Sequence, residues 1–125
     1  LIELIVVVVI LGILAAILLP TFAGYIVRAN EAADLAHARL IHTAALIGLA
    51  EKKFAVSGTF TADEFGNTPE PFSNYVGIDW PRPKSAGASY FAVSIINVHV
   101  NPVVEVIRIR GGVNEVYDTS SHAFR

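Results

Sequence analysis

The chain of 125 residues contains no cysteine, so neither a disulfide framework nor a thiolate metal site is open to it. Cationic side chains are also few. Nine Lys and Arg against eleven Asp and Glu give a net charge of −2, without the basic footprint typical of proteins that bind nucleic acid. The sequence also lacks a phosphate-binding glycine loop, a nucleophile elbow and a paired-carboxylate motif. We therefore predict a protein that is not an enzyme, takes no cofactor and has no specific nucleic-acid partner.

Histidines and acidic residues form no recognisable metal site. The four histidines are scattered along the sequence: His37, His42, His99 and His122. The first two are five residues apart, a spacing that does not place them on one face of a helix. Asp63, Glu64 and Glu70 could offer oxygen ligands to calcium, but they match no calcium-loop signature, and a solvated acidic turn is the simpler interpretation. We predict no metal ligand.

Charge is missing from residues 1–27 except at Glu3. Residues 4–27 would span about 36 Å as a helix, against roughly 30 Å of hydrocarbon in a bilayer. The run is too long for the apolar region of a signal peptide and no basic segment precedes it, so we expect it to belong to the mature protein. It is a candidate membrane-spanning helix.

Glu3 lies where a carboxylate is unfavourable, because an ionised side chain in hydrocarbon costs on the order of 3 kcal/mol. Arg28, the nearest cation in the sequence, is a whole helix length away. The simplest partner is therefore an amino terminus, and that of a neighbouring subunit can reach. The alternative is that Glu3 lies at the level of the lipid headgroups.

The interior of the apolar run contains small and helix-breaking residues. Gly12 and Ala16 form a small-xxx-small step that lets another helix approach closely. Pro20 cannot donate a backbone hydrogen bond, and a glycine costs roughly 1 kcal/mol relative to alanine in a helix, so the stretch from Gly12 to Pro20 is a weak span. It either unwinds in an assembly or forms a simple kink at the membrane exit.

The segment LIELIVVVVILGILAAILLP resembles the N-terminal segment of type IV pilins and of the related pseudopilins, with a class III-type methylation segment. The resemblance covers about residues 1–27. It implies a basic leader removed by a prepilin peptidase, N-methylation of the new first residue, and two residues, typically Phe-Thr, before Leu1. It also implies that Glu3 pairs with the amine of a neighbouring subunit and that the Gly12 to Pro20 stretch extends in a filament.

Beyond residue 27 the helical period continues, and we predict one helix from about residue 1 to 55, ended by Ser57-Gly58. The expected buried stripe contains Ala36, Leu40, Ala44, Ile47 and Phe54. The expected solvent-facing residues are charged: Arg28, Glu31, Asp34, Arg39, Glu51 and Lys52. Lys52 and Lys53 are expected in the last turn, where the helix dipole favours cations.

The sequence from residue 58 onward predicts loops followed by a sheet. Residues 58–88 are rich in turn formers, with at most one short strand near 73–79. Three β-rich runs, 89–100, 103–110 and 113–118, are separated by Asn101-Pro102 and Gly111-Gly112, which predicts two tight hairpins. Arg108 and Arg110 share one face of the second run, and we expect them at the surface. One face of the first run covers the helix, and the other meets a loop or another subunit.

The predicted fold is α+β. A long N-terminal helix has a projecting apolar half and an amphipathic half packed on a domain, followed by a C-terminal antiparallel meander of three to four strands. Residues 1–27 form the transmembrane or filament-core helix. Residues 28–125 form one globular pilin domain, divided into the helix half (28–57), the loop region (58–88) and the meander (89–118).

We expect a structural subunit that polymerises into a type IV pilus, with copies of itself, the inner membrane, prepilin peptidase and the assembly machinery as partners. It would lie in the inner membrane before assembly and in an extracellular filament afterwards. The alternatives are a pseudopilin of a type II secretion or competence system and a single-pass membrane-anchored binding domain. Many relatives join their C-terminal loop by a disulfide; this chain has none, so sheet hydrogen bonds, packing or subunit contacts must hold its end.

Overall fold

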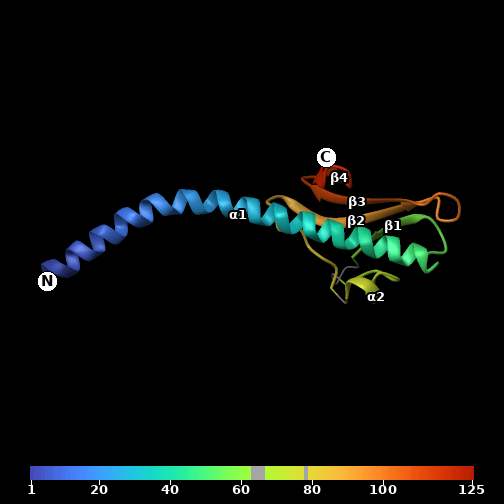
Figure 1. Ribbon diagram of the computed structural model, residues 1–125, viewed down its shortest axis with the longest axis horizontal. Coiled ribbons are helices and arrows are strands. Elements are labelled where there is room, and N and C mark those ends of the chain that lie inside the picture. The colour runs from blue at the N-terminus through green and yellow to red at the C-terminus, as the bar shows by residue number, and fades with distance from the viewer. Residues whose placement is uncertain (63–66, 78) are drawn as a thin grey trace.

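One helix, α1 (Ile2–Ala50), runs through the first two fifths of the chain and projects far beyond the rest of the molecule (Figure 1). The computed structural model describes residues 1–62, 67–77 and 79–125. A sheet of five antiparallel strands packs against the second half of α1, whereas residues 1–29 are exposed along their whole length. The predicted α+β class is therefore confirmed, with the two halves of the helix in different surroundings.

Helix α1 ends at Ala50, five residues before the predicted end. The Lys52 amide donates to the Leu49 carbonyl at 3.1 Å and the Lys53 amide to the Gly48 carbonyl at 2.9 Å, and Lys52 has φ +58°. This pattern is a Schellman motif, which terminates a helix through one left-handed residue. Lys52 and Lys53 thus lie beyond the helix, so their predicted place in its last turn is wrong.

The sheet is a meander in which neighbours in space are neighbours in sequence. Its strands are β1 (Gly58–Thr61), β2 (Ala88–Ile96), β3 (Val103–Arg110), β4 (Val113–Asp118) and β5 (Ala123–Phe124). Arg110 pairs with Val113 around a two-residue turn in which Gly111 and Gly112 have φ of +55° and +81°. Two positive φ values are what a type I′ turn requires, and this tight hairpin is confirmed.

Two sequence expectations for the sheet are wrong. Ile96 pairs with Val103, so β2 ends four residues early and six residues, not a tight Asn101-Pro102 turn, connect it to β3. Asn97, with φ +57°, takes the chain out of the strand at that point. Within the predicted loop region, residues 58–61 form strand β1, and the segment expected as a strand contains the short helix α2 (Ser73–Val76) instead.

The buried face of α1 is not the predicted one. Its members recur at steps of four and three: Asp34, Ala38, Ile41, Ala45 and Gly48, with Ala44 beside them. Of the predicted stripe only Ala44 and Phe54 are buried, while Ala36, Leu40 and Ile47 are exposed. Because alanine occurs on nearly every face, the apolar periodicity defines no single stripe; small residues at the contact let the sheet approach closely.

Aromatic rings fill the space between the distal half of α1 and the sheet. The ring of Phe72 lies 5.2 Å from that of Phe54, 5.5 Å from Phe60 and 5.4 Å from Trp80, and the Trp80 indole donates to the Phe91 carbonyl at 2.9 Å. These edge and tilted arrangements are those that aromatic pairs prefer. The helix-facing side of β2 consists of Phe91, Val93 and Ile95, all fully buried.

Candidate assembly surface and helix junction

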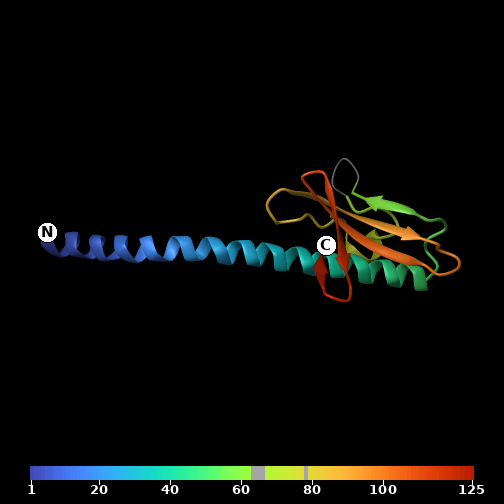
Figure 2. The same cartoon turned by 90° about the horizontal axis from the view of Figure 1, so that it is seen from above.

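The projecting half of α1 is the largest apolar surface of the chain. Its large hydrophobic side chains from Leu1 to Val27 are between 50 % and 99 % exposed, and the helix is long and apolar enough to cross a membrane. Figure 2 shows the same segment standing clear of the sheet from a second direction. Soluble monomers rarely expose contiguous apolar patches above a few hundred Å². This surface therefore requires lipid or another protein to cover it.

Glu3 lies in the first turn of α1, where the helix dipole favours a negative charge. Within the described residues its carboxylate has no hydrogen bond or ion pair, and Arg28 is 25 positions along the helix, or about 37 Å away. Any counter-charge for Glu3 in a membrane or in an apolar bundle must therefore come from outside this helix.

Gly12 and Ala16 lie one above the other on the free helix, four residues apart. A Cβ atom added at Gly12 would meet nothing within 4 Å, so this close-approach face is open. The helix passes Pro20 without a break, and the Thr21 hydroxyl donates to the Ile17 carbonyl at 3.2 Å. The single chain is thus fully helical through this stretch, and unwinding in a filament stays a prediction.

The apolar surface continues behind the domain. Ala29, Ala32, Ala36, Leu40 and Ile47 are exposed on the side of α1 turned away from the sheet, and Leu40 and Ile47 are 44 % and 42 % exposed. The steps of three, four and seven between them make one helical stripe in register with the free half. Ala36, Leu40 and Ile47 were predicted as core; the structure places them on the same open surface as the projecting helix.

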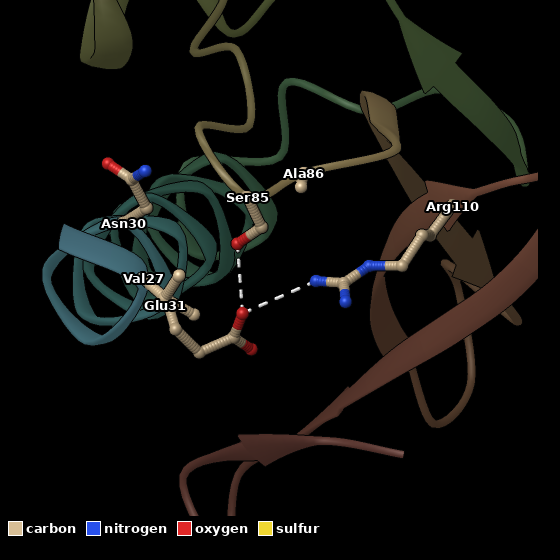
Figure 3. Close-up of a pocket in the computed structure, with 6 residues that line it drawn as sticks. All are labelled: Val27, Asn30, Glu31, Ser85, Ala86 and Arg110. Atoms are coloured by element: carbon tan, nitrogen blue, oxygen red, sulfur yellow. Dashed lines mark hydrogen bonds and ion pairs between the residues drawn. The ribbon is translucent and has the colours of Figure 1, made fainter. Parts of the chain in front are cut away.

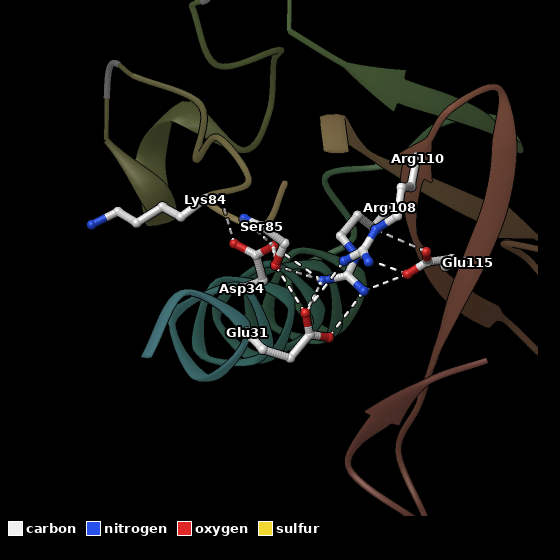
Figure 4. A network of polar contacts seen from close by, with 7 residues as sticks. All are labelled: Glu31, Asp34, Lys84, Ser85, Arg108, Arg110 and Glu115. Carbon is white, nitrogen blue, oxygen red and sulfur yellow. Dashed lines mark hydrogen bonds and ion pairs between the residues drawn. The ribbon is translucent and has the colours of Figure 1, made fainter. Parts of the chain in front are cut away.

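Where α1 meets the sheet, Arg108 gathers three carboxylates (Figure 4). Its guanidinium donates to Glu31 at 3.0 Å and to Asp34 at 3.0 Å, both from α1, and its Nε donates to Glu115 of β4 at 2.9 Å. The Arg108 side chain is 2 % exposed and Asp34 is fully buried. Both were expected at the surface, and both predictions are wrong. We call Glu31, Asp34, Ser85, Arg108 and Glu115 the junction network.

Asp34 also holds the loop that leads into β2. Its carboxylate accepts hydrogen bonds from the Lys84 amide at 2.6 Å, the Ser85 amide at 3.1 Å and the Ser85 hydroxyl at 2.5 Å. Burial raises the pKa of Asp34, but these bonds and Arg108 outweigh it, so the pKa lies below the ordinary value. Asp34 is therefore an anion that ties helix, loop and strand together.

The electrostatics of Glu31 and Arg108 agree with this arrangement. The hydrogen bond from Arg108 lowers the pKa of Glu31. Burial alone would lower the pKa of Arg108, yet its bonds to Glu31, Glu115 and Asp34 raise it above the ordinary value. Each partner stabilises the charged form of the other, as expected for charge-assisted hydrogen bonds with little solvent.

The outer side of the network opens into a hollow of about 120 Å³ at the point where α1 leaves the domain (Figure 3). Glu31 points into it from the helix, Ser85 from the loop and Arg110 from β3. Arg110 donates to Glu31 at 3.3 Å, and its side chain is 37 % exposed. Exposure to solvent therefore increases from Asp34, which is fully buried in the network, to Arg110 at its outer side.

The C-terminal strand covers the network from its other side. The Arg108 guanidinium carbon lies 4.0 Å above the centre of the Phe124 ring, a cation–π contact. The Arg125 and Val116 backbones exchange two hydrogen bonds of 2.8 Å, and the Arg125 side chain pairs with Asp118 at 2.7 Å. Sheet hydrogen bonds and packing, two of the three alternatives left open for a chain without cysteine, hold the end in place.

Sequence reasoning missed the junction network, although two signals for it existed. Asp34 precedes Ala38 and Ile41 by the helical steps of four and seven residues. Arg108 is two residues after Val106, so both lie on the core-facing side of β3. An acid in a helix stripe and a base in a strand stripe together suggest a buried pair. Neither stripe is distinct without its partner, because the two residues are 74 positions apart.

A metal centre receives no support from the residues described. No group of three or more His, Asp or Glu side chains that could hold an ion occurs among them. Asp63 and Glu64 lie outside the described residues. His42 instead packs edge-on against Tyr117 with ring centres 6.4 Å apart, and burial lowers its pKa.

Comparison of the chain with protein-family models, curated proteins and solved structures finds no match.

Proposed function

We propose that this chain is a structural subunit that polymerises through α1 into a filament of the type IV pilus kind. The observation that carries the proposal is the exposed apolar surface of one unbroken helix, continuous from its projecting half onto the back of the domain. Covering that surface with copies of the same helix buries it from end to end, and Gly12 with Ala16 permits close contact.

The extent of the surface favours a polymer over a simple membrane anchor. A bilayer accounts for about 20 helical residues. The exposed stripe continues through Leu40 to Ile47, well past that length and alongside the domain. A membrane anchor would leave the apolar side chains beside the domain exposed to water, whereas a bundle of parallel helices would bury them.

Glu3 sets the axial position of each subunit in this proposal. An acid in an apolar bundle is stable only opposite a cation, and the amine of an adjacent chain is the available one. Each incoming subunit then advances along the filament until the two charges meet. Before assembly the same helix lies in the inner membrane; after it, the filament is extracellular.

Replacing Glu3 by glutamine tests this role. Loss of one partner of a buried pair costs on the order of 3 kcal/mol, or about a hundredfold in the equilibrium for adding a subunit. We expect the yield of fibres sheared from Glu3→Gln cells to fall to background. The control variant Glu70→Gln, which replaces an exposed acid of the domain, is expected to leave the yield unchanged.

Two results separate the alternatives. Equal fibre yield from Glu3→Gln and from the unchanged chain, at equal protein level, contradicts the role of Glu3, whereas an unchanged chain that yields no fibres at all contradicts polymerisation and leaves a tethered domain. Short fibres confined to the periplasm, seen by electron microscopy of the same cells, assign the chain to a pseudopilus.

A further inference from the structure

We infer that the junction network is a shear clamp, a set of directional bonds that passes axial load from the projecting helix into the sheet. The inference rests on the proposed function in one respect only, that a filament places its subunits under tension. The clamp itself is a property of the single chain.

The position of the network is the first ground for the inference. Residues 1–29 of α1 are exposed, so a pull on the helix is not resisted along that length. Glu31 and Asp34 make the first polar bonds between the helix and the domain, to Arg108, which is 77 and 74 residues further along the chain. Load that enters through the helix therefore reaches Arg108 first.

The second ground is direction. Figures 1 and 2 show α1 running alongside β2 and β3 at a shallow angle, so a pull on the N-terminal end slides the helix along the sheet. Apolar contacts are non-directional and slide easily, and here the contact consists largely of alanine and glycine. The fork of a guanidinium has fixed geometry, and a shift of one or two ångströms breaks its bonds.

The third ground is the dryness of the inner bonds. Asp34 is fully buried and Arg108 is 2 % exposed, with the Phe124 ring covering the guanidinium. Water cannot replace a broken bond until the strand above has moved. Such pairs add little to equilibrium stability compared with apolar packing, yet separating them is strongly unfavourable. The network thus resists motion more than it stabilises the fold.

The test is force spectroscopy on the full chain in detergent. Since the chain has no cysteine, two introduced thiols define the pulling points. Ala23→Cys on the free helix and Asn101→Cys on the β2–β3 turn load the junction in shear. Glu31→Gln and Arg108→Lys, which keep the fold hydrogen-bonded but break the fork geometry, are expected to raise the unfolding rate at fixed load at least about tenfold.

A second pulling geometry separates a clamp from general stability. Lys52→Cys with Asn101→Cys separates the two distal ends and loads the aromatic cluster before the junction. There the Glu31→Gln and Arg108→Lys chains are expected to unfold at the unchanged rate, and Glu105→Gln, a β3 acid outside the network, is expected to alter neither geometry. Equal acceleration in both geometries, or none in shear, overturns the clamp.

The outcome is independent of polymerisation. If the single chain shows no clamp, the expected loss of fibres from Glu3→Gln is unchanged, because Glu3 lies 28 residues before Glu31. A chain that forms no fibres can equally retain the direction-dependent resistance of its junction.

Discussion

Replacing Gly48 by alanine adds one methyl group where an aromatic ring already lies. Gly48 is buried on the sheet-facing side of α1, and a Cβ atom built there comes within 2.6 Å of Phe54 Cε2 and 3.3 Å of Phe54 Cζ. The Phe54 ring is itself confined between Phe60 at 5.3 Å and Phe72 at 5.2 Å. The new methyl group therefore cannot be accommodated by a small rotation of the ring.

Two opposing contributions set the size of the effect. Alanine is better than glycine in a helix interior by roughly 1 kcal/mol. Overpacking a confined core site costs about 1 to 3 kcal/mol, and the 2.6 Å approach places Gly48 at the upper end. We expect a net loss of about 2 kcal/mol in the free energy of unfolding. With a urea slope of about 1.5 kcal/mol per molar, the midpoint falls by roughly 1 M.

Trp80 reports this unfolding, because it is the only tryptophan and is 3 % exposed in the same aromatic cluster. Its fluorescence is followed against urea with the full chain in detergent. Gly24→Ala is the matched control, since a Cβ there meets nothing within 4 Å and no packing cost is expected. A Gly48→Ala midpoint equal to or above that of the unchanged chain refutes the packing argument.

Two further predictions concern acid and the hairpin. Because the folded pKa values of Glu31 and Asp34 lie below their ordinary values of 4.5 and 3.8, the network's contribution to stability is complete above these ordinary values and is lost as pH falls through the lowered folded values. The urea midpoint should therefore drop below pH 4.5, in addition to an earlier decline below pH 6.5 that follows from the lowered pKa of His42, and the drop below pH 4.5 should be less steep in Asp34→Asn. An equal slope in Asp34→Asn would falsify the assignment of this acid dependence to Asp34. Gly111→Val forces a β-branched residue to φ +55°, so a loss of about 1 to 2 kcal/mol is expected by urea titration, whereas Gly111→Asn should be nearly neutral, and a neutral valine would contradict the type I′ turn.

The junction network also explains how a domain with so few large apolar side chains on its helix keeps one arrangement. The buried face of the helix has small side chains at Ala38 and Ala45 and none at Gly48, so it has few projections that interlock with the sheet. A helix with such a face can pack in more than one rotation or register. Asp34 and Arg108 remove that freedom, because any shift leaves a buried charge unpaired. We expect polar bonds to specify the packing here and apolar burial to supply most of its free energy.

Local patterns in the sequence determined several parts of this molecule. The apolar run through residue 27, charged only at Glu3, dictates a helix that must be covered by lipid or protein, and Gly111-Gly112 between β-rich runs dictates a tight hairpin. Helical period and strand alternation depend on neighbours within a few residues, so the α+β order of elements can be predicted from the sequence alone. The expectations for Glu3, Gly12, Ala16 and Pro20 follow from the same local chemistry.

Only the tertiary structure decided which face of α1 is buried, and with it the role of the charges. Asp34 is core and Leu40 is surface, although hydropathy predicts the reverse, because Arg108 lies opposite Asp34 and no described residue of the domain covers Leu40. The Phe54 ring lies against Gly48 just beyond the Schellman motif that ends the helix, a contact that helix propensity does not predict. A side chain's surroundings here depend on residues as many as 79 positions away, and periodicity within one segment cannot show them.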